Sequence, residues 1–159
     1  MTRVNITENI WYDPEVKNYV MLDVTDAVGA QEARVIDGVD LLPKHEYHVT
    51  LVPAGKLGKT ALEVAAIINN IESFLKQHPA VMQFQKLGTE RYICRKDDEM
   101  TLIAPAVITG LDALRAIVRQ RVPDYQPAFP HVTLLKSANS PYGIGINSQK
   151  DLANYCIKV

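Results

Sequence analysis

Two short segments of the sequence share residue types that can perform acid–base chemistry. Residues 47–52 read YHVTLV and residues 130–135 read PHVTLL, so each contains the tetrapeptide His-Val-Thr-Leu. Because side chains alternate along a strand, the His and Thr of each segment project from one face and the apolar residues from the other. Each segment therefore predicts a strand that is anchored by its apolar side and offers an imidazole and a hydroxyl on the opposite side.

The repetition is unusual for a chain of this composition. With four His and nine Thr in 159 residues, random placement predicts about 0.2 His-x-Thr triplets, and two triplets in roughly 2% of such chains. One half-buried strand histidine is usually structural, but a matched pair is poorly explained in that way. We therefore interpret His48, Thr50, His131 and Thr133 as one candidate site.

Phosphoryl chemistry suits these four side chains. Displacement at a phosphodiester needs a base for the nucleophile, an acid for the leaving oxygen and donors for the non-bridging oxygens. His48 and His131 can divide the roles of acid and base, since imidazoles titrate near neutral pH. The hydroxyls of Thr50 and Thr133 can then bind the phosphate. In-line displacement places nucleophile and leaving group on opposite sides of phosphorus, so we expect the histidines on opposite walls.

The surrounding sequence predicts both helices and strands. A helix is expected from Thr60, where Thr60-x-x-Glu63 forms a capping box, until Pro79 stops it. A second helix is expected from near Thr109, with Pro123 beyond its end. Runs rich in Val, Ile, Leu and aromatic residues predict strands at residues 19–25, 46–52, 81–87, 91–95, 100–108, 129–135 and 154–159.

The two motifs occupy similar places in two halves of the chain. From the start of a preceding strand to the histidine there are 29 residues in one half (Tyr19 to His48) and 31 in the other (Met100 to His131). A helix fills the second interval, and the poorly defined stretch 27–36 is expected to be helical in the first. We predict an α+β fold in which residues 1–159 form one domain with two related lobes, the second from about residue 98. Mixed or antiparallel sheets would face a central cleft, with helices packed outside.

Composition narrows the classes of function and location. The formal net charge of −1 and 22% charged residues argue against a protein that binds long nucleic acid through many phosphate contacts on a basic surface. Binding of a small nucleotide or an RNA end is still compatible with this composition. No apolar run approaches the ~20 residues of a membrane span, and residues 1–18 do not resemble a signal peptide. Cys94 and Cys156 match neither a metal site nor a redox pair, so we expect reduced thiols and a cytoplasmic protein.

The sequence favours neither a metal nor a cofactor. His45 and His48 are three residues apart, a spacing at which two histidines on a helix can bind one metal ion. Pro43 and the residues after it favour a strand instead. On a strand these two histidines would point to opposite faces, and no third ligand has convincing spacing. We expect no metal and no cofactor.

The paired motifs resemble those of the 2H phosphoesterase superfamily. That superfamily combines two H-x-T-apolar strands about 80 residues apart, and its members include LigT-like 2′-5′ RNA ligases and 2′,3′-cyclic phosphodiesterases. The resemblance covers roughly residues 19–135. It implies a bilobal fold, metal-independent catalysis by His48 and His131, and phosphate binding by Thr50 and Thr133.

Two tyrosines are further candidates for substrate binding. In relatives an aromatic residue of the central hairpin often stacks on the base, and Tyr92 stands near that place, although plain strand packing is the alternative. Tyr142 lies in the Gly-rich turn 141–145, which could close over substrate or be a simple surface turn.

Together these features predict a phosphodiesterase acting on a small nucleotide or an RNA end. The bond cleaved would be a cyclic phosphate, a 2′-5′ linkage or a 3′-5′ linkage. Two alternatives stay open: a nucleotide-binding sensor that has lost turnover, and a ligase that joins RNA ends by running the same chemistry in reverse.

Overall fold

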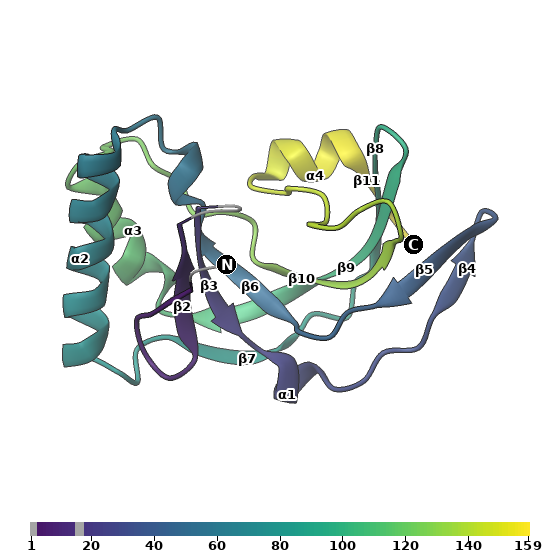
Figure 1. The fold of residues 1–159 in the computed structure, drawn as a ribbon, viewed down its shortest axis with the longest axis horizontal. Coiled ribbons are helices and arrows are strands. Elements are labelled where there is room, and N and C mark those ends of the chain that lie inside the picture. Colours follow the sequence, from purple (N-terminus) through teal and green to yellow (C-terminus); the bar gives the residue numbers. More distant parts are fainter. Residues whose placement is uncertain (1–2, 15–17) are drawn as a thin grey trace. The chain divides into compact units, whose positions relative to one another are not determined.

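The computed structural model describes residues 3–14 and 18–159 and has a mixed α+β fold with a large antiparallel sheet (Figure 1). Its helical segments are α1 (Thr25–Val28), the 3₁₀ segment η1 (Ala54–Lys56), α2 (Ala61–Gln77), α3 (Leu111–Arg119) and α4 (Gln149–Tyr155). Its strands are β1 (Val4–Asn5), β2 (Ile10–Asp13), β3 (Tyr19–Asp23), β4 (Arg34–Ile36), β5 (Val39–Pro43), β6 (His48–Val52), β7 (Gln83–Leu87), β8 (Tyr92–Lys96), β9 (Glu99–Thr109), β10 (His131–Ser137) and β11 (Cys156–Lys158).

The chain forms two compact units, each assembled from three segments. The first unit comprises Met1–Asp23, Thr50–Gln85 and Ile108–Ala128, and the second comprises Val24–Val49, Lys86–Val107 and Phe129–Val159. The chain therefore passes from one unit to the other inside three strands: in β6 after Val49, in β7 after Gln85 and in β9 after Val107.

Helices α2 and α3 pack against each other in the first unit, where β2 also pairs with β3 (Figure 1). α2 buries the apolar positions that recur at helical spacing: Val64, Ile67, Ile68, Ile71 and Leu75. The predicted capping box is confirmed. The Thr60 hydroxyl accepts from the Glu63 backbone N–H at 3.2 Å, and the Glu63 carboxylate accepts from the Thr60 N–H at 3.4 Å. These bonds satisfy backbone donors that the first turn of a helix leaves without partners.

An antiparallel array of strands in the second unit supports one of the two motifs. β10 pairs with β9 along one edge, while β6 and β5 pair with its other edge. β8 then pairs with β9, and β11 pairs with β8. β10 is thus an interior strand, which holds its backbone by hydrogen bonds on both sides.

One expected helix is wrong. Residues 27–36 were expected to be helical, but α1 ends at Val28, and Gly29 follows with φ of 74°. The chain then forms the β4–β5 hairpin, whose turn is Asp37 (φ 52°) and Gly38 (φ 76°). An Asp-Gly pair with two positive φ values favours a two-residue hairpin, and this local preference prevails over a helix.

The other expected elements are present with modest changes in length. Strands are found within or beside each predicted range, and the longest, β9, extends from Glu99 to Thr109. The elements that the sequence patterns do not predict are β1, β2, β4, β5, η1 and α4. None of the helices in the described part of the chain is both long and apolar enough to cross a membrane.

Candidate active site

The two motif strands show the side-chain alternation that the sequence predicts. In β6 and β10 the His and Thr positions are partly exposed, whereas Val49, Leu51, Val132 and Leu134 are at most 2% exposed. The apolar side of each strand therefore lies in the core. His48 and Thr50 share the other side of β6, and His131 and Thr133 share the other side of β10.

The pairing of β6 with β10 brings the two histidines onto neighbouring strands. Val132 is the antiparallel partner of Val49, so extending this register by one residue sets His48 across from Thr133. Directly opposed residues have Cβ atoms about 4.5–5.5 Å apart. His48 and His131 are then diagonal neighbours, with Cβ atoms separated by about 7–8 Å or less.

This arrangement differs from the expected opposite walls. The two motifs lie on adjacent strands of one sheet, related by a local twofold that exchanges His48 with His131 and Val49 with Val132. Diagonal placement still sets one imidazole on each side of a group that lies over the backbone of the Val49–Val132 pair, on the face opposite the valine side chains. Thr50 follows His48 along β6 but belongs to the first unit, whereas His48, His131 and Thr133 all belong to the second.

The backbone just before His48 is anchored to Thr25, the first residue of α1, and to Val24, which precedes it. The N–H of Tyr47 donates to the Thr25 hydroxyl at 2.9 Å, and that hydroxyl donates to the Tyr47 carbonyl at 3.3 Å. The same carbonyl accepts from the Val24 N–H at 2.9 Å. Tyr47 itself is buried, and its phenol accepts from the Lys44 N–H at 3.2 Å. These bonds hold the backbone of Tyr47, the residue before β6 begins.

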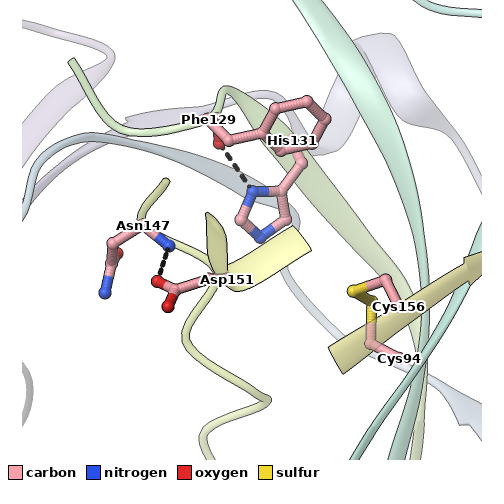
Figure 2. The surroundings of a disulfide bond; sticks show 6 residues. All are labelled: Cys94, Phe129, His131, Asn147, Asp151 and Cys156. Atoms are coloured by element: carbon pink, nitrogen blue, oxygen red, sulfur yellow. Dashed lines mark hydrogen bonds between the residues drawn. A yellow bond between two sulfur atoms is a disulfide. The ribbon is translucent and has the colours of Figure 1, made fainter. Parts of the chain in front are cut away.

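His131 is oriented by the residue two positions before it. Its Nδ1 lies 2.8 Å from the carbonyl oxygen of Phe129 (Figure 2). A carbonyl oxygen only accepts, so Nδ1 carries a proton and donates it. The neutral ring then has its lone pair on Nε2, the nitrogen on the far side, and Nε2 is the atom that exchanges protons with a ligand. The Phe129 ring also stacks on the imidazole, with centroids 5.8 Å apart and an interplanar angle of 23°.

Tyr92 belongs to the same aromatic group. Its ring meets Phe129 edge to face, with centroids 6.4 Å apart. Its hydroxyl donates to the Glu90 carboxylate at 2.7 Å, and this hydrogen bond raises the pKa of Tyr92 above its usual value. Both rings pack against the buried cluster Cys94, Ile103, Ile144 and Ile146. Tyr92 therefore has a packing role beside Phe129, and its contact with a base stays a prediction.

The Gly-rich turn after β10 approaches Thr133. Gly143 has φ of 75°, and a Cβ built there would lie 3.8 Å from the Thr133 hydroxyl oxygen. Lys136 holds the turn by donating from Nζ to the Pro141 carbonyl at 3.1 Å. Tyr142, the neighbouring tyrosine, is 61% exposed. The turn thus borders the motif face near Thr133, and a role of Tyr142 in binding substrate stays a prediction.

The expectation of two reduced thiols is wrong. Cys94 and Cys156 form a disulfide between directly paired residues of β8 and β11, with Cα atoms 4.0 Å apart and a sequence separation of 62 (Figure 2). Cys94 is fully buried, whereas Cys156 is partly exposed. The pairing depends on the register of β11, which no local sequence pattern reveals.

Metal ligands do not converge at the candidate site in the residues described. No group of three or more His, Cys, Asp or Glu side chains is placed to hold a metal within residues 3–14 and 18–159. His45, which shares a spacing of three with His48, is exposed in the loop before β6.

Phe129 and Gly143 lie beside the motif residues, and neither was predicted from the sequence. Phe129 could have been found from its spacing, because residues 129, 131 and 133 share one face of an extended segment. The approach of Gly143 to Thr133 depends on the path of a loop and had no comparable signal.

Comparison with known proteins adds no identification. The chain matches no protein-family model, no curated protein and no solved structure.

Proposed function

We propose that this protein is a metal-independent phosphodiesterase. Its substrate would be a small nucleotide, a small oligonucleotide or an RNA end that contains a cyclic phosphate, a 2′-5′ linkage or a 3′-5′ linkage. His48 and His131 would be the catalytic acid and base, and the hydroxyls of Thr50 and Thr133 would bind the phosphate.

The observation that carries this proposal is the antiparallel pairing of two identical motifs. The Val49–Val132 pair places His48 across from Thr133 and diagonal to His131. An imidazole and a hydroxyl from different motifs thereby flank one region of the sheet surface. Such a region suits a tetrahedral anion that needs hydrogen-bond donors at its oxygens and a proton carrier on either side.

The reaction can be written for a 2′,3′-cyclic phosphate. One imidazole accepts a proton from water, whose oxygen forms a new bond to phosphorus. The bond between phosphorus and one ribose oxygen breaks, and that oxygen takes a proton from the other imidazole. Threonine hydroxyls donate to the non-bridging oxygens, which carry the negative charge.

The orientation of His131 supports this scheme. Because the Phe129 carbonyl holds Nδ1–H, proton exchange with substrate uses Nε2 whether His131 acts as acid or as base. A fixed tautomer lowers the reorganisation required at the moment of reaction. The resemblance to the 2H superfamily implies two related lobes facing a cleft; this finer arrangement is part of the proposal, and the local twofold of β6 and β10 supports it.

The decisive experiment is a substrate panel in the presence of EDTA. The panel comprises 2′,3′-cyclic mononucleotides, 2′-5′ oligoadenylates and cyclic di- and trinucleotides, with products resolved by chromatography. We expect turnover of at least one class, undiminished by the chelator. The variant His48→Ala/His131→Ala serves as the blank, because it removes both proton carriers.

Three other outcomes of this experiment would contradict the proposal or favour one of its alternatives. Activity that EDTA abolishes and a divalent ion restores would contradict metal independence. Binding without turnover, seen as a ligand-induced rise in melting temperature, would favour the sensor. Product formation only from an RNA end with a 2′,3′-cyclic phosphate and a second end with a free hydroxyl would favour end joining.

A further inference from the structure

The disulfide holds the last helix and strand beside the aromatic residues that orient His131. α4 packs against β8 and β11, and Leu152, Tyr155 and Cys156 pack on the buried cluster that contains Cys94. Phe129 and Tyr92 pack on the same cluster. One small core therefore joins the disulfide to Phe129, whose carbonyl and ring both contact His131 (Figure 2).

Apart from the disulfide and the packing of Leu152 and Tyr155 on the cluster, the described contacts of this C-terminal segment are mostly exposed. β11 has three residues, paired with three of β8. Lys158 Nζ lies 3.2 Å from the exposed Glu90 carboxylate, and Lys96 Nζ lies 5.1 Å from the centre of the Tyr155 ring. Exposed ion pairs contribute little, and a three-residue edge strand is marginal in isolation. The disulfide is therefore the strongest single restraint among the described contacts between β11 and β8.

We propose that the Cys94–Cys156 disulfide is a positioning element for His131, so that reducing it lowers turnover at the candidate site. This inference rests on the proposed function. The route runs from the disulfide through the cluster to Phe129, which fixes the tautomer and the plane of the imidazole. Without the bond, α4 and β11 are held on β8 only by three strand pairs and by the packing of Leu152 and Tyr155, so the cluster on which Phe129 packs is less firmly held.

The chemical step is thiol–disulfide exchange with a dithiol reductant. A thiolate of the dithiol attacks Sγ of the partly exposed Cys156, forming a mixed disulfide and releasing the Cys94 thiolate, which takes a proton. The second thiol of the reductant then closes its own disulfide, and Cys156 leaves as a thiol. Two electrons pass from the dithiol to the protein, and both cysteines end protonated.

The first test compares oxidised and dithiothreitol-reduced protein with the best substrate of the panel. We expect reduction to lower kcat by about 10- to 100-fold, because small misplacements of a catalytic group have effects of that size. Re-oxidation should restore kcat. The double variant Cys94→Ala/Cys156→Ala is the matched control: its kcat should be low from the outset and insensitive to dithiothreitol. Equal kcat in oxidised and reduced protein would overturn the inference while leaving the proposed function intact.

The second test measures the tautomer of His131 in the absence of substrate. Long-range ¹H–¹⁵N spectra of the imidazoles, with His131→Ala for assignment, should show one Nδ1-protonated tautomer in oxidised protein and an averaged pattern after reduction. Unchanged His131 signals would overturn the inference even if no substrate were turned over. Loss of the far-ultraviolet circular dichroism on reduction would also overturn it, since the bond would then hold the whole fold rather than one side chain.

The third test keeps the disulfide and changes Phe129, the residue that links the buried cluster to His131. Phe129→Leu removes the ring stacked on His131, and Phe129→Tyr retains it. Both variants keep the backbone carbonyl that bonds Nδ1, so the tautomer should persist in each. We expect the leucine variant to lower kcat with a smaller change in KM, and the tyrosine variant to restore kcat. Equal behaviour of the two variants would contradict a route through Phe129.

Discussion

Strands β6 and β10 carry the same tetrapeptide but are held by different surroundings. β6 is fixed just before its histidine by bonds between the Tyr47 backbone, the Thr25 hydroxyl and the Val24 N–H. Both are interior strands, β6 between β3 and β10 and β10 between β6 and β9, but in β10 the histidine ring is itself held by the carbonyl and the ring of Phe129. The bonds described before β6 act on the backbone, and those described at β10 act on the imidazole of His131.

This difference shows that the tetrapeptide and its surroundings determine different properties of each strand. The local pattern His-Val-Thr-Leu determines which side chains are buried, and it does so equally in both strands. The environment of each imidazole comes from residues outside the tetrapeptide. Two like groups acquire the separate roles of acid and base only through such environments.

The largest expected effect comes from removing either imidazole. His48→Ala and His131→Ala should each lower kcat by about 10²–10⁴-fold, because each removes a proton carrier. Both positions are partly exposed, so circular dichroism and melting temperature should stay close to wild type. His45→Ala, three residues before His48 and exposed, is the matched control and should retain activity. Near wild-type turnover in either motif variant would refute the assignment.

Double substitution tests whether the strands act as a unit. His48→Ala/His131→Ala should lose far less than the product of the two single effects, because either substitution already interrupts the paired proton transfer. Multiplicative losses, measured as kcat/KM, would instead indicate two independent sites.

The pH profile should reveal two imidazoles in opposite protonation states. Activity falls on the acid side as the base gains its proton, and on the alkaline side as the acid loses its own. We expect a bell-shaped kcat/KM profile with limbs within a unit or two of ~6.5, the usual histidine value. Each limb belongs to the coupled pair, but each single alanine variant should flatten one limb of its residual activity. A wild-type profile flat from about pH 5 to 9, with chemistry rate-limiting, would exclude the mechanism.

Removing one threonine hydroxyl should have a smaller effect. Thr133→Val keeps the branched shape but deletes a donor to the phosphate, and a hydrogen bond to a charged group is worth about 1.5–3 kcal/mol. We therefore expect kcat/KM to fall by roughly 10- to 100-fold, with Thr133→Ser retaining most activity. Thr50→Val makes the same test on β6, and similar losses in both would support equivalent roles. Unaltered kinetics in both valine variants would remove the threonines from the site.

Much of the fold could be predicted because it depends on local patterns. The capping box of α2 and the alternation of β10 follow from neighbouring residues, and both are confirmed. The β4–β5 hairpin had the local signal Asp37-Gly38, which the helix expectation overlooked. The disulfide and the Gly143–Thr133 approach join residues through register and loop path, so the sequence alone could not place them.

The smallest expected effect on kcat comes from a variant that weakens the backbone anchor before β6 and leaves both imidazoles in place. Thr25→Val removes the hydroxyl that bonds both backbone groups of Tyr47. An amide left without its partner costs about 1–3 kcal/mol, or a fall in melting temperature of roughly 2–4 °C per kcal/mol in a chain of this size. Because this support lies before the motif and the His48 ring is retained, kcat should change by less than about threefold, well under 1 kcal/mol in activation free energy.

The matched control for that variant is Thr60→Ala, which breaks the α2 capping box. It should destabilise by about 1 kcal/mol and leave kcat unchanged. Thermal unfolding and kinetics measured on both variants distinguish the two supports. If Thr25→Val lowered kcat as strongly as Phe129→Leu, the supports of β6 and β10 would act in the same way. The contrast between the two motif strands would then lie in their stability alone.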